Sequence, residues 1–316
     1  MPPLGSSDLD VHPLCLGGNV FGWTIGEEAS FAVLDAYAAA GGDFIDTADV
    51  YSAWVEGNAG GESETLIGRW MASRGNRDEM VVATKVGMLH GFDTLDEPTI
   101  WAACDASLER LQTDRIDLYY AHQDDADTPL TVTLPAFDEL VQEGKVRVLG
   151  ASNYGPERLA EALQVSQREG LARFEVLQPK YNLVDRGAYE GELSELCARH
   201  GIACVPYSGL ASGFLTGKYR PGGDEVDSPR AGGARRYLDG GPGAQVLEAL
   251  DVVAEARGAS VAAVALAWLG AQPTVAAPVA SARSPEQLAD LLAAAALELS
   301  GDELGRLDSA SQGAPV

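Results

Sequence analysis

Short apolar runs alternate along this chain with longer segments in which apolar residues recur every three or four positions. The short runs predict strands, and the longer segments predict helices with one buried face. This alternation occurs eight times. The predicted strands cover residues 14–16, 43–46, 80–85, 116–122, 146–152, 174–178, 202–206 and 274–278.

The predicted helices begin and end at recognisable residues. Gly41 follows the first helix and is a good stop, and Pro156 is a favoured first-turn residue. The stretches 284–287 and 300–303 have the spacing of capping boxes, which predicts a helix start at each. The predicted helices cover residues 27–40, 62–73, 97–111, 132–143, 156–167, 189–199, 244–257 and 260–270, followed by one from 285 and a short one from 301.

Short strands that are apolar throughout and alternate with helices are typical of a parallel sheet covered by helices. Eight such units in 316 residues predict an α/β fold, a single (β/α)8 TIM barrel over residues 1–316 with C-terminal helices. A doubly wound sheet competes with this barrel, but no GxGxxG motif follows the first strand. We expect residues 3–13 to form a small appendage and the glycine-rich stretch 222–243 to form a mobile lid or a solvated loop.

Composition limits the partners and the compartment. A net charge of -25 and a pI near 4.3 argue against nucleic acid or an acidic membrane as a partner, because the surface repels phosphates. There is no CxxC pair, so the cysteines are expected to be buried thiols in a cytoplasmic protein without a structural metal. The N-terminus has no signal-peptide pattern, and no apolar run reaches membrane length.

Four side chains that could take part in acid–base chemistry lie at or just beyond the ends of three successive predicted strands. Asp46 ends the second predicted strand, Tyr51 follows five residues later, and Lys85 and His122 end the next two. Because the carboxyl ends of barrel strands meet at one mouth, we expect these side chains to converge. A lysine cation lowers the pKa of a nearby phenol, and Asp46 would hold that cation in place. With a hydrogen bond from His122, the set suits protonation of an alkoxide formed by hydride addition to a carbonyl group.

The pattern Asp46-Thr-Ala-x-x-Tyr51, with Lys85 and His122 at later strand ends, resembles the catalytic tetrad of the aldo-keto reductase superfamily. The resemblance covers residues 14 to about 292. It implies a (β/α)8 barrel and an oxidoreductase that transfers hydride between NADP(H) and a carbonyl or alcohol. It also implies that Tyr51 is the general acid, that Lys85 and Asp46 tune it, and that His122 orients the carbonyl.

The same resemblance implies a nicotinamide cofactor, usually NADPH, bound without a Rossmann domain. Ser152, Asn153 and Gln178 match the residues that hold the carboxamide, and Tyr207 matches the tyrosine that stacks on the nicotinamide. The positions that match the loop around the pyrophosphate are Ser208, Leu210, Gly213 and Lys218. The positions that match the adenosine 2′-phosphate and adenine site are Ser281, Arg283, Gln287 and Asp290.

Two positions depart from this family pattern. Leu291 replaces an asparagine that often contacts adenine, which weakens the case for NADPH over NADH, and Ala280 replaces the usual glycine. The residues expected either to form a hydrophobic substrate wall or to pack in the core are Trp23, Trp54 and Leu89.

Other interpretations remain open. Each tetrad residue taken singly has an ordinary structural role, such as a helix cap, a packed aromatic or a core histidine. A nicotinamide-binding regulatory subunit with little turnover, as in potassium-channel β subunits of the same fold, is separated from a reductase by assay with a simple aldehyde and NADPH. A Schiff-base aldolase would use Lys85 and would be trapped by borohydride. A barrel metal hydrolase would use His90, His122, Asp124 and Asp125 and would contain metal.

Overall fold

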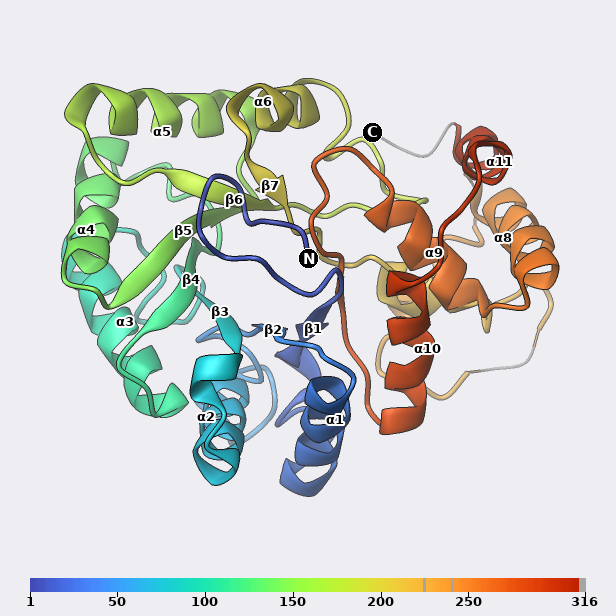
Figure 1. The fold of residues 1–316 in the computed structure, drawn as a ribbon, viewed down its shortest axis with the longest axis horizontal. Coiled ribbons are helices and arrows are strands. Elements are labelled where there is room, and N and C mark those ends of the chain that lie inside the picture. The colour runs from blue at the N-terminus through green and yellow to red at the C-terminus, as the bar shows by residue number, and fades with distance from the viewer. Residues whose placement is uncertain (224–225, 240, 313–316) are drawn as a thin grey trace.

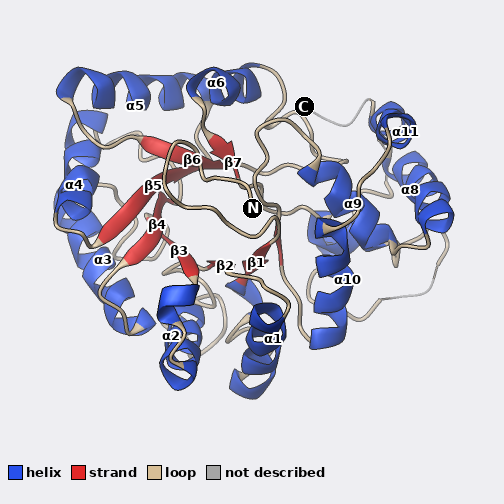
Figure 2. Cartoon of the chain, in the orientation of Figure 1, coloured by secondary structure: helices blue, strands red, loops and turns tan. Residues whose placement is uncertain are grey.

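The computed structural model describes residues 1–223, 226–239 and 241–312. Parallel strands form one sheet in the order β7-β6-β5-β4-β3-β2-β1-β8 (Figures 1 and 2). The segment before β8 also pairs with β7, because the amide of Cys204 donates to the carbonyl of Thr274 at 2.7 Å. The predicted (β/α)8 fold is therefore confirmed. The strands are β1 (Cys15–Gly17), β2 (Phe44–Asp46), β3 (Val81–Val86), β4 (Ile116–Ala121), β5 (Val146–Ser152), β6 (Phe174–Gln178), β7 (Ala203–Cys204) and β8 (Val279–Ala280).

Helices surround this sheet, and Figure 1 shows α8 and α11 outside α9 and α10. Among the described residues, no single helix is long and apolar enough to cross a membrane, and the one pair that passes together, α8 with α9, is bent by 98°. The helices are α1 (Glu27–Ala39), α2 (Glu62–Arg74), α3 (Glu97–Leu111), α4 (Leu130–Gln142), α5 (Pro156–Glu169), α6 (Glu192–His200), α7 (Ala231–Arg235), α8 (Gly243–Arg257), α9 (Val261–Gly270), α10 (Pro285–Ala295) and α11 (Gly301–Ser311), with short 3-10 turns η1 (Gly18–Val20), η2 (Arg77–Glu79) and η3 (Ala211–Thr216).

Several element boundaries differ from the prediction. The last strand was expected at 274–278, but β8 covers only Val279–Ala280, and β7 ends at Cys204. Proline explains both limits, because Pro206 and Pro278 have no amide hydrogen for the ladder. The stretch 222–243 contains the short helix α7, and its residues 224, 225 and 240 lie outside the described part of the chain.

The N-terminal segment closes the base of the barrel and is not the separate appendage that we expected. Pro3 and Asp10 form an antiparallel bridge, and Figure 1 shows this dark blue segment crossing the centre of the sheet. The side chains of Leu4, Leu9 and Val11 are at most 4% exposed, and they pack against inward-facing strand residues. Apolar burial therefore holds the segment in place.

Side chains alternate along each strand between the barrel interior and the surrounding helices. On β4, Leu118 and Tyr120 pack in the interior, whereas Tyr119 packs against the helices. The ring of Tyr120 fills the space next to β5, where a Cβ added to Gly150 would lie 2.4 Å from it. Only glycine leaves this space free, so the interior fixes the residue type at position 150.

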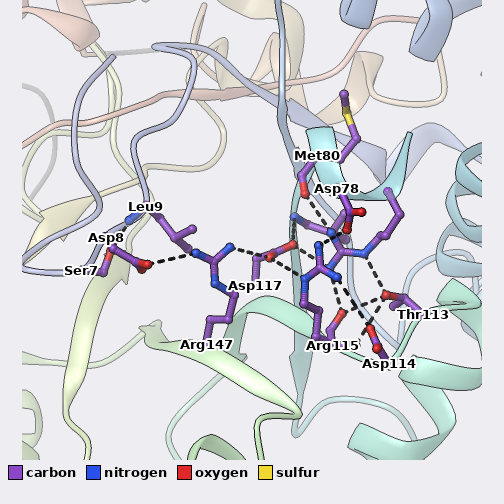
Figure 3. Close-up of polar contacts among 12 residues, drawn as sticks. Ser7, Asp8, Leu9, Asp78, Met80, Thr113, Asp114, Arg115, Asp117 and Arg147 are labelled. Carbon is purple, nitrogen blue, oxygen red and sulfur yellow. Dashed lines mark hydrogen bonds and ion pairs between the residues drawn. The ribbon is translucent and has the colours of Figure 1, made fainter. Parts of the chain in front are cut away.

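A buried carboxylate ties the amino ends of the central strands together. Asp117 on β4 is 1% exposed and accepts from Arg77 at 2.7 Å and from Arg147 at 3.1 Å. It also accepts from the amide of Val82 at 2.9 Å. Figure 3 shows Asp117 between Arg147 and Arg115, with Asp8 of the N-terminal segment beyond Arg147. Charges at this end of a barrel serve stability.

We expect Asp117→Ala to lower the free energy of unfolding by about 3 kcal/mol, because it leaves partly buried guanidinium groups without their carboxylate. Asp114→Ala is the matched control, since the side chain of Asp114 is 92% exposed and pairs with Arg115 only at 3.7 Å. That control should change stability by less than about 0.5 kcal/mol. Urea unfolding measures both variants, and equal small losses would show that the Asp117 cluster is not stabilising.

Candidate active site

The candidate site is the last inward-facing layer at the carboxyl ends of the strands. Period-two alternation places Asp46 two residues after inward-facing Phe44, and Lys85 two residues after inward-facing Ala83. The same spacing places His122 after Tyr120. On the next two strands this layer is completed by Ser152 and Gln178.

Lys85 lies at the centre of this layer with an exposed fraction of 0%. Its Nζ donates to Asp46 Oδ2 at 2.7 Å and to the carbonyl of Thr47 at 2.7 Å. It also lies 3.0 Å from Tyr51 Oη, which in turn lies 3.2 Å from Asp46 Oδ2. The structure therefore brings together the three residues that the sequence placed on separate strand ends and loops.

Amide and hydroxyl groups form a second network beside these three residues. Gln178 Nε2 donates to Asp46 Oδ1 at 2.8 Å, so both oxygens of that carboxylate are engaged. Ser152 Oγ donates to the carbonyl of Gln178 at 3.0 Å, and Tyr207 Oη donates to Asn153 Oδ1 at 2.9 Å. Asn153 has a φ of 58°, in the left-handed region that side chains rarely adopt. Such backbone strain is typical of residues that clamp a ligand.

The pKa of Tyr51 is shifted in the direction opposite to the one that we expected. We predicted that Lys85 would lower it, but burial raises the pKa of Tyr51 well above its usual range, and Asp46 raises it further. The prediction considered only the cation, whereas the hydroxyl also lies beside the carboxylate of Asp46 and is largely surrounded by protein. Tyr51 therefore keeps its proton at neutral pH, as a proton donor must.

His122 faces the same space from the end of β4. Its ring lies 6.1 Å from that of Tyr51, measured between centroids. Burial, and then Lys85, lower the pKa of His122 well below its usual range, so the imidazole stays neutral near pH 7. Nδ1 is buried without a hydrogen-bond partner among the described residues, which leaves Nε2 to face the cleft.

A cleft of about 750 Å³ opens over this layer. Its volume lies within the range of ligand-binding pockets. Tyr51, Asp46 and His122 line its base, whereas Lys85 is covered by them. The other predicted site residues that line it are Trp23, Ser152, Asn153, Gln178, Tyr207, Ser208, Leu210, Gly213, Lys218, Ser281, Arg283, Gln287 and Asp290.

Two residues predicted as substrate contacts do not line the cleft. Leu89 is 9% exposed and packs beside Gly60 under the loop that carries Tyr51. Trp54 is half exposed and makes edge contacts with the rings of Trp23 at 5.4 Å and Tyr51 at 6.2 Å. Trp54 therefore lies outside the cleft and packs against two of the residues that form its wall.

Arg230 is a site residue that sequence reasoning missed. Its guanidinium stacks over Trp23 at 5.2 Å and donates to Asn19 Oδ1 at 3.2 Å, which places it in the cleft. Burial lowers the pKa of Arg230, and the nearby positive charge of Arg283 lowers it further. The sequence offered one signal, since Arg230 is a cation in the stretch that we expected to form a lid.

Comparison with known proteins agrees with this geometry. The model of the Aldo/keto reductase family matches residues 13–312. The chain belongs to the aldo/keto reductase family.

Individual relatives of this aldo/keto reductase come from fungi and bacteria. Norsolorinic acid reductase stcV of Emericella nidulans is 33% identical over 94% of this chain and 78% of its own length. Aryl-alcohol dehydrogenase GME11368 of Pestalotiopsis microspora is 31% identical over 96% of this chain and 79% of its own length. Protein tas of Escherichia coli strain K12 is 31% identical over 97% of this chain and 96% of its own length.

The residues of this aldo/keto reductase suit the nicotinamide cofactor that such enzymes use. Amide and hydroxyl groups lie at the catalytic end of the cleft, and three cationic side chains, Lys218, Arg230 and Arg283, lie along it. In a chain with a net charge of -25, three cations lining one cleft are suited to phosphate groups. Among the described residues, no group of three or more His, Cys, Asp or Glu side chains is placed to hold a metal ion.

We expect the ring of His122 to remain neutral at pH 5.5, where a histidine of ordinary pKa is about nine-tenths protonated. The cause is burial beside Lys85. The stability that comes from neutral His122 is full above pH 6.5 and is lost as pH falls below it. Imidazole nitrogen NMR measures the protonation, with His122→Asn to assign the signals. A doubly protonated His122 ring at pH 5.5 would contradict this environment.

Proposed function

We propose that this protein is an NADP-dependent reductase that converts an aldehyde or ketone to an alcohol, or catalyses the reverse oxidation, with Tyr51 as the general acid. One observation carries the proposal. A tyrosine hydroxyl that keeps its proton lies 3.0 Å from a buried ammonium group at the base of a cleft. That cleft has polar amides at one end and cationic side chains along its length.

A reduced nicotinamide, when bound, would supply hydride to the carbonyl carbon and would itself be oxidised. As the C–H bond forms, the electron pair of the C=O π bond moves to oxygen. Tyr51 Oη transfers its proton to that oxygen, and the phenolate left behind is stabilised by the Lys85 ammonium. Asp46 holds the ammonium group in place through a hydrogen bond of 2.7 Å. The alcohol leaves, and Tyr51 regains a proton from solvent.

His122 holds the carbonyl oxygen for this proton transfer. Its neutral ring has one N–H to donate, and Nε2 is the nitrogen that faces the cleft. A neutral donor suits the task, because it polarises the carbonyl group without competing with Tyr51 to supply the proton.

The cationic side chains favour NADPH over NADH. Helix α10 begins at Pro285, two residues after Arg283, and the positive end of its dipole would favour an anion there. Arg283 would pair with the phosphate that only NADP(H) carries. Lys218 and Arg230 would lie nearer the pyrophosphate, which both cofactors share. Gln287 fixes the local backbone, since its Oε1 accepts from the amide of Arg283 at 3.1 Å.

An aromatic carbonyl compound is the substrate class that the mouth of the cleft fits best. Trp23 lines the cleft beside Tyr51, which gives a planar ring an aromatic side chain to pack against, and Trp54 supports both rings from outside the wall. The name of the relative from Pestalotiopsis microspora, an aryl-alcohol dehydrogenase, also supports an aromatic substrate.

Tyr51→Phe should lower kcat for benzaldehyde reduction by about 10²- to 10⁴-fold, because it removes the proton donor and keeps the ring. NADPH affinity, measured by fluorescence titration, should stay nearly unchanged. Tyr154→Phe is the control, since it removes a buried hydroxyl that has no partner among the described residues. Loss of NADPH binding in Tyr51→Phe would contradict the assigned role. Wild-type protein that binds NADPH without reducing any carbonyl would favour a regulatory subunit.

Arg283→Ala should weaken NADPH binding by about 10- to 100-fold and leave NADH binding nearly unchanged, because it removes charged hydrogen bonds to the extra phosphate. Lys218→Ala is the matched comparison, since a cation at the pyrophosphate should affect both cofactors alike. Fluorescence titration of wild type and both variants with each cofactor gives the six dissociation constants. Equal weakening of both cofactors by Arg283→Ala would remove the basis for the NADPH preference.

A further inference from the structure

Asp49 lies between Asp46 and Tyr51 on the loop after β2, yet it does not line the cleft. Its exposed fraction is 1%. Neither carboxyl oxygen has a hydrogen-bond partner among the residues that the structure describes. A carboxylate in this position would have lost its water without gaining a donor, which is costly.

The charged and polar groups around Asp49 come from four elements, and none of them donates to its carboxyl oxygens. Glu64 on α2 is fully buried, and it already accepts from Thr84 Oγ1 on β3 at 2.5 Å and from Arg110 Nε on α3 at 2.6 Å. The cation of Arg110 is therefore engaged with Glu64. Lys85 on β3 is engaged with Asp46, and the hydroxyl of Tyr119 on β4 is buried with no partner of its own among the described residues.

These surroundings favour the uncharged carboxylic acid. Burial, and then the carboxylate of Glu64, raise the pKa of Asp49 to about 8, while Arg110, the amide of Val50 and Lys85 act in the opposite direction by less. Tyr51 does not titrate in the same range, because its pKa is raised well above 10. A change in activity between pH 7 and 9 would therefore not come from the titration of Tyr51.

The backbone of Asp49 is directly connected to the catalytic groups. Its amide donates to the carbonyl of Lys85 at 3.3 Å, and the Lys85 ammonium donates to the carbonyl of Thr47 at 2.7 Å. The amide of Tyr51 donates to the carbonyl of Ala48 at 3.2 Å. Residues 47–51 thus wrap around Lys85, and a displaced Asp49 side chain would move the hydroxyl of Tyr51.

We propose that Asp49 is a positioning residue, which must be uncharged for the loop to hold Tyr51 beside Lys85, and whose ionisation in alkaline solution slows the reduction. This inference rests on the proposed function of Tyr51 as the general acid. It adds a pH-sensitive support behind the site, on the side away from the substrate.

The ratio of kcat at pH 9 to kcat at pH 7, measured within each variant for benzaldehyde reduction at saturating NADPH, tests the proposal. Wild type should lose about tenfold, because about one carboxyl in eleven remains protonated one pH unit above its pKa. Asp49→Asn and Asp49→Leu should lose less than about twofold, since neither side chain ionises. Asp93→Asn, which removes an exposed carboxylate after β3, should keep the tenfold loss of wild type.

A tenfold loss in both Asp49 variants, or its absence in wild type, would overturn the proposal. Two variants are used so that the test survives if one of them impairs folding. Asparagine keeps a polar group at this position, whereas leucine places an apolar side chain of similar size there. If wild type reduces no carbonyl compound, the proposed function fails. If wild type is an active reductase but its pH profile is the same as that of the Asp49 variants, only the role of Asp49 fails.

Unfolding in urea tests the uncharged state without any assay of activity. An acid whose pKa is raised on folding contributes stability that is full below its ordinary pKa and is lost as pH rises to its folded value. Between pH 5 and 7, the unfolding constant of wild type should therefore rise by about tenfold per pH unit relative to Asp49→Asn or Asp49→Leu. Parallel pH profiles would show that Asp49 is ionised in the folded protein and would refute the proposal.

Discussion

An ammonium group sealed inside the barrel is the constraint on which the site depends. Lys85 has no exposed surface, so its charge must be balanced by neighbouring groups, which are the carboxylate of Asp46 and the carbonyl of Thr47. Asp46 is fixed in turn by Gln178 from the far side of the sheet. Only one direction around the ammonium remains, and Tyr51 occupies it. The geometry of the proposed proton transfer thus follows from the cost of burying a charge.

The two ends of the barrel use buried charge differently. At the amino ends of the strands, Asp117 accepts from several arginines and a backbone amide, and the cleft lined by its partner Arg147 measures only about 230 Å³. At the carboxyl ends, the ion pair of Lys85 and Asp46 lies directly under a cleft. Because the ends are separated by the apolar interior, variation at one end is buffered from the other.

Much of the fold could be predicted from the sequence, because the apolar strands and their helices have clear periods. Period-two alternation also carries Asp46 and Lys85 to the interior, so their convergence follows from strand ends alone. What the sequence could not show were effects that depend on distant segments. The pKa of Tyr51 follows from burial, and Arg230 reaches the cleft from the glycine-rich stretch. The end of β7 depends on proline at 206, a signal that was present but not used.

The closure of the base by the N-terminal segment has a consequence for biosynthesis. Leu4, Leu9 and Val11 leave the ribosome before the barrel strands, but the interior that receives them also includes Ala276 and Ala277. The three residues therefore lack part of their final contacts until residues 276 and 277 have emerged. Such a high sequence separation between partners slows folding and prolongs the exposure of apolar surface. The segment that closes the base is thus fully buried only after the last part of the barrel has formed.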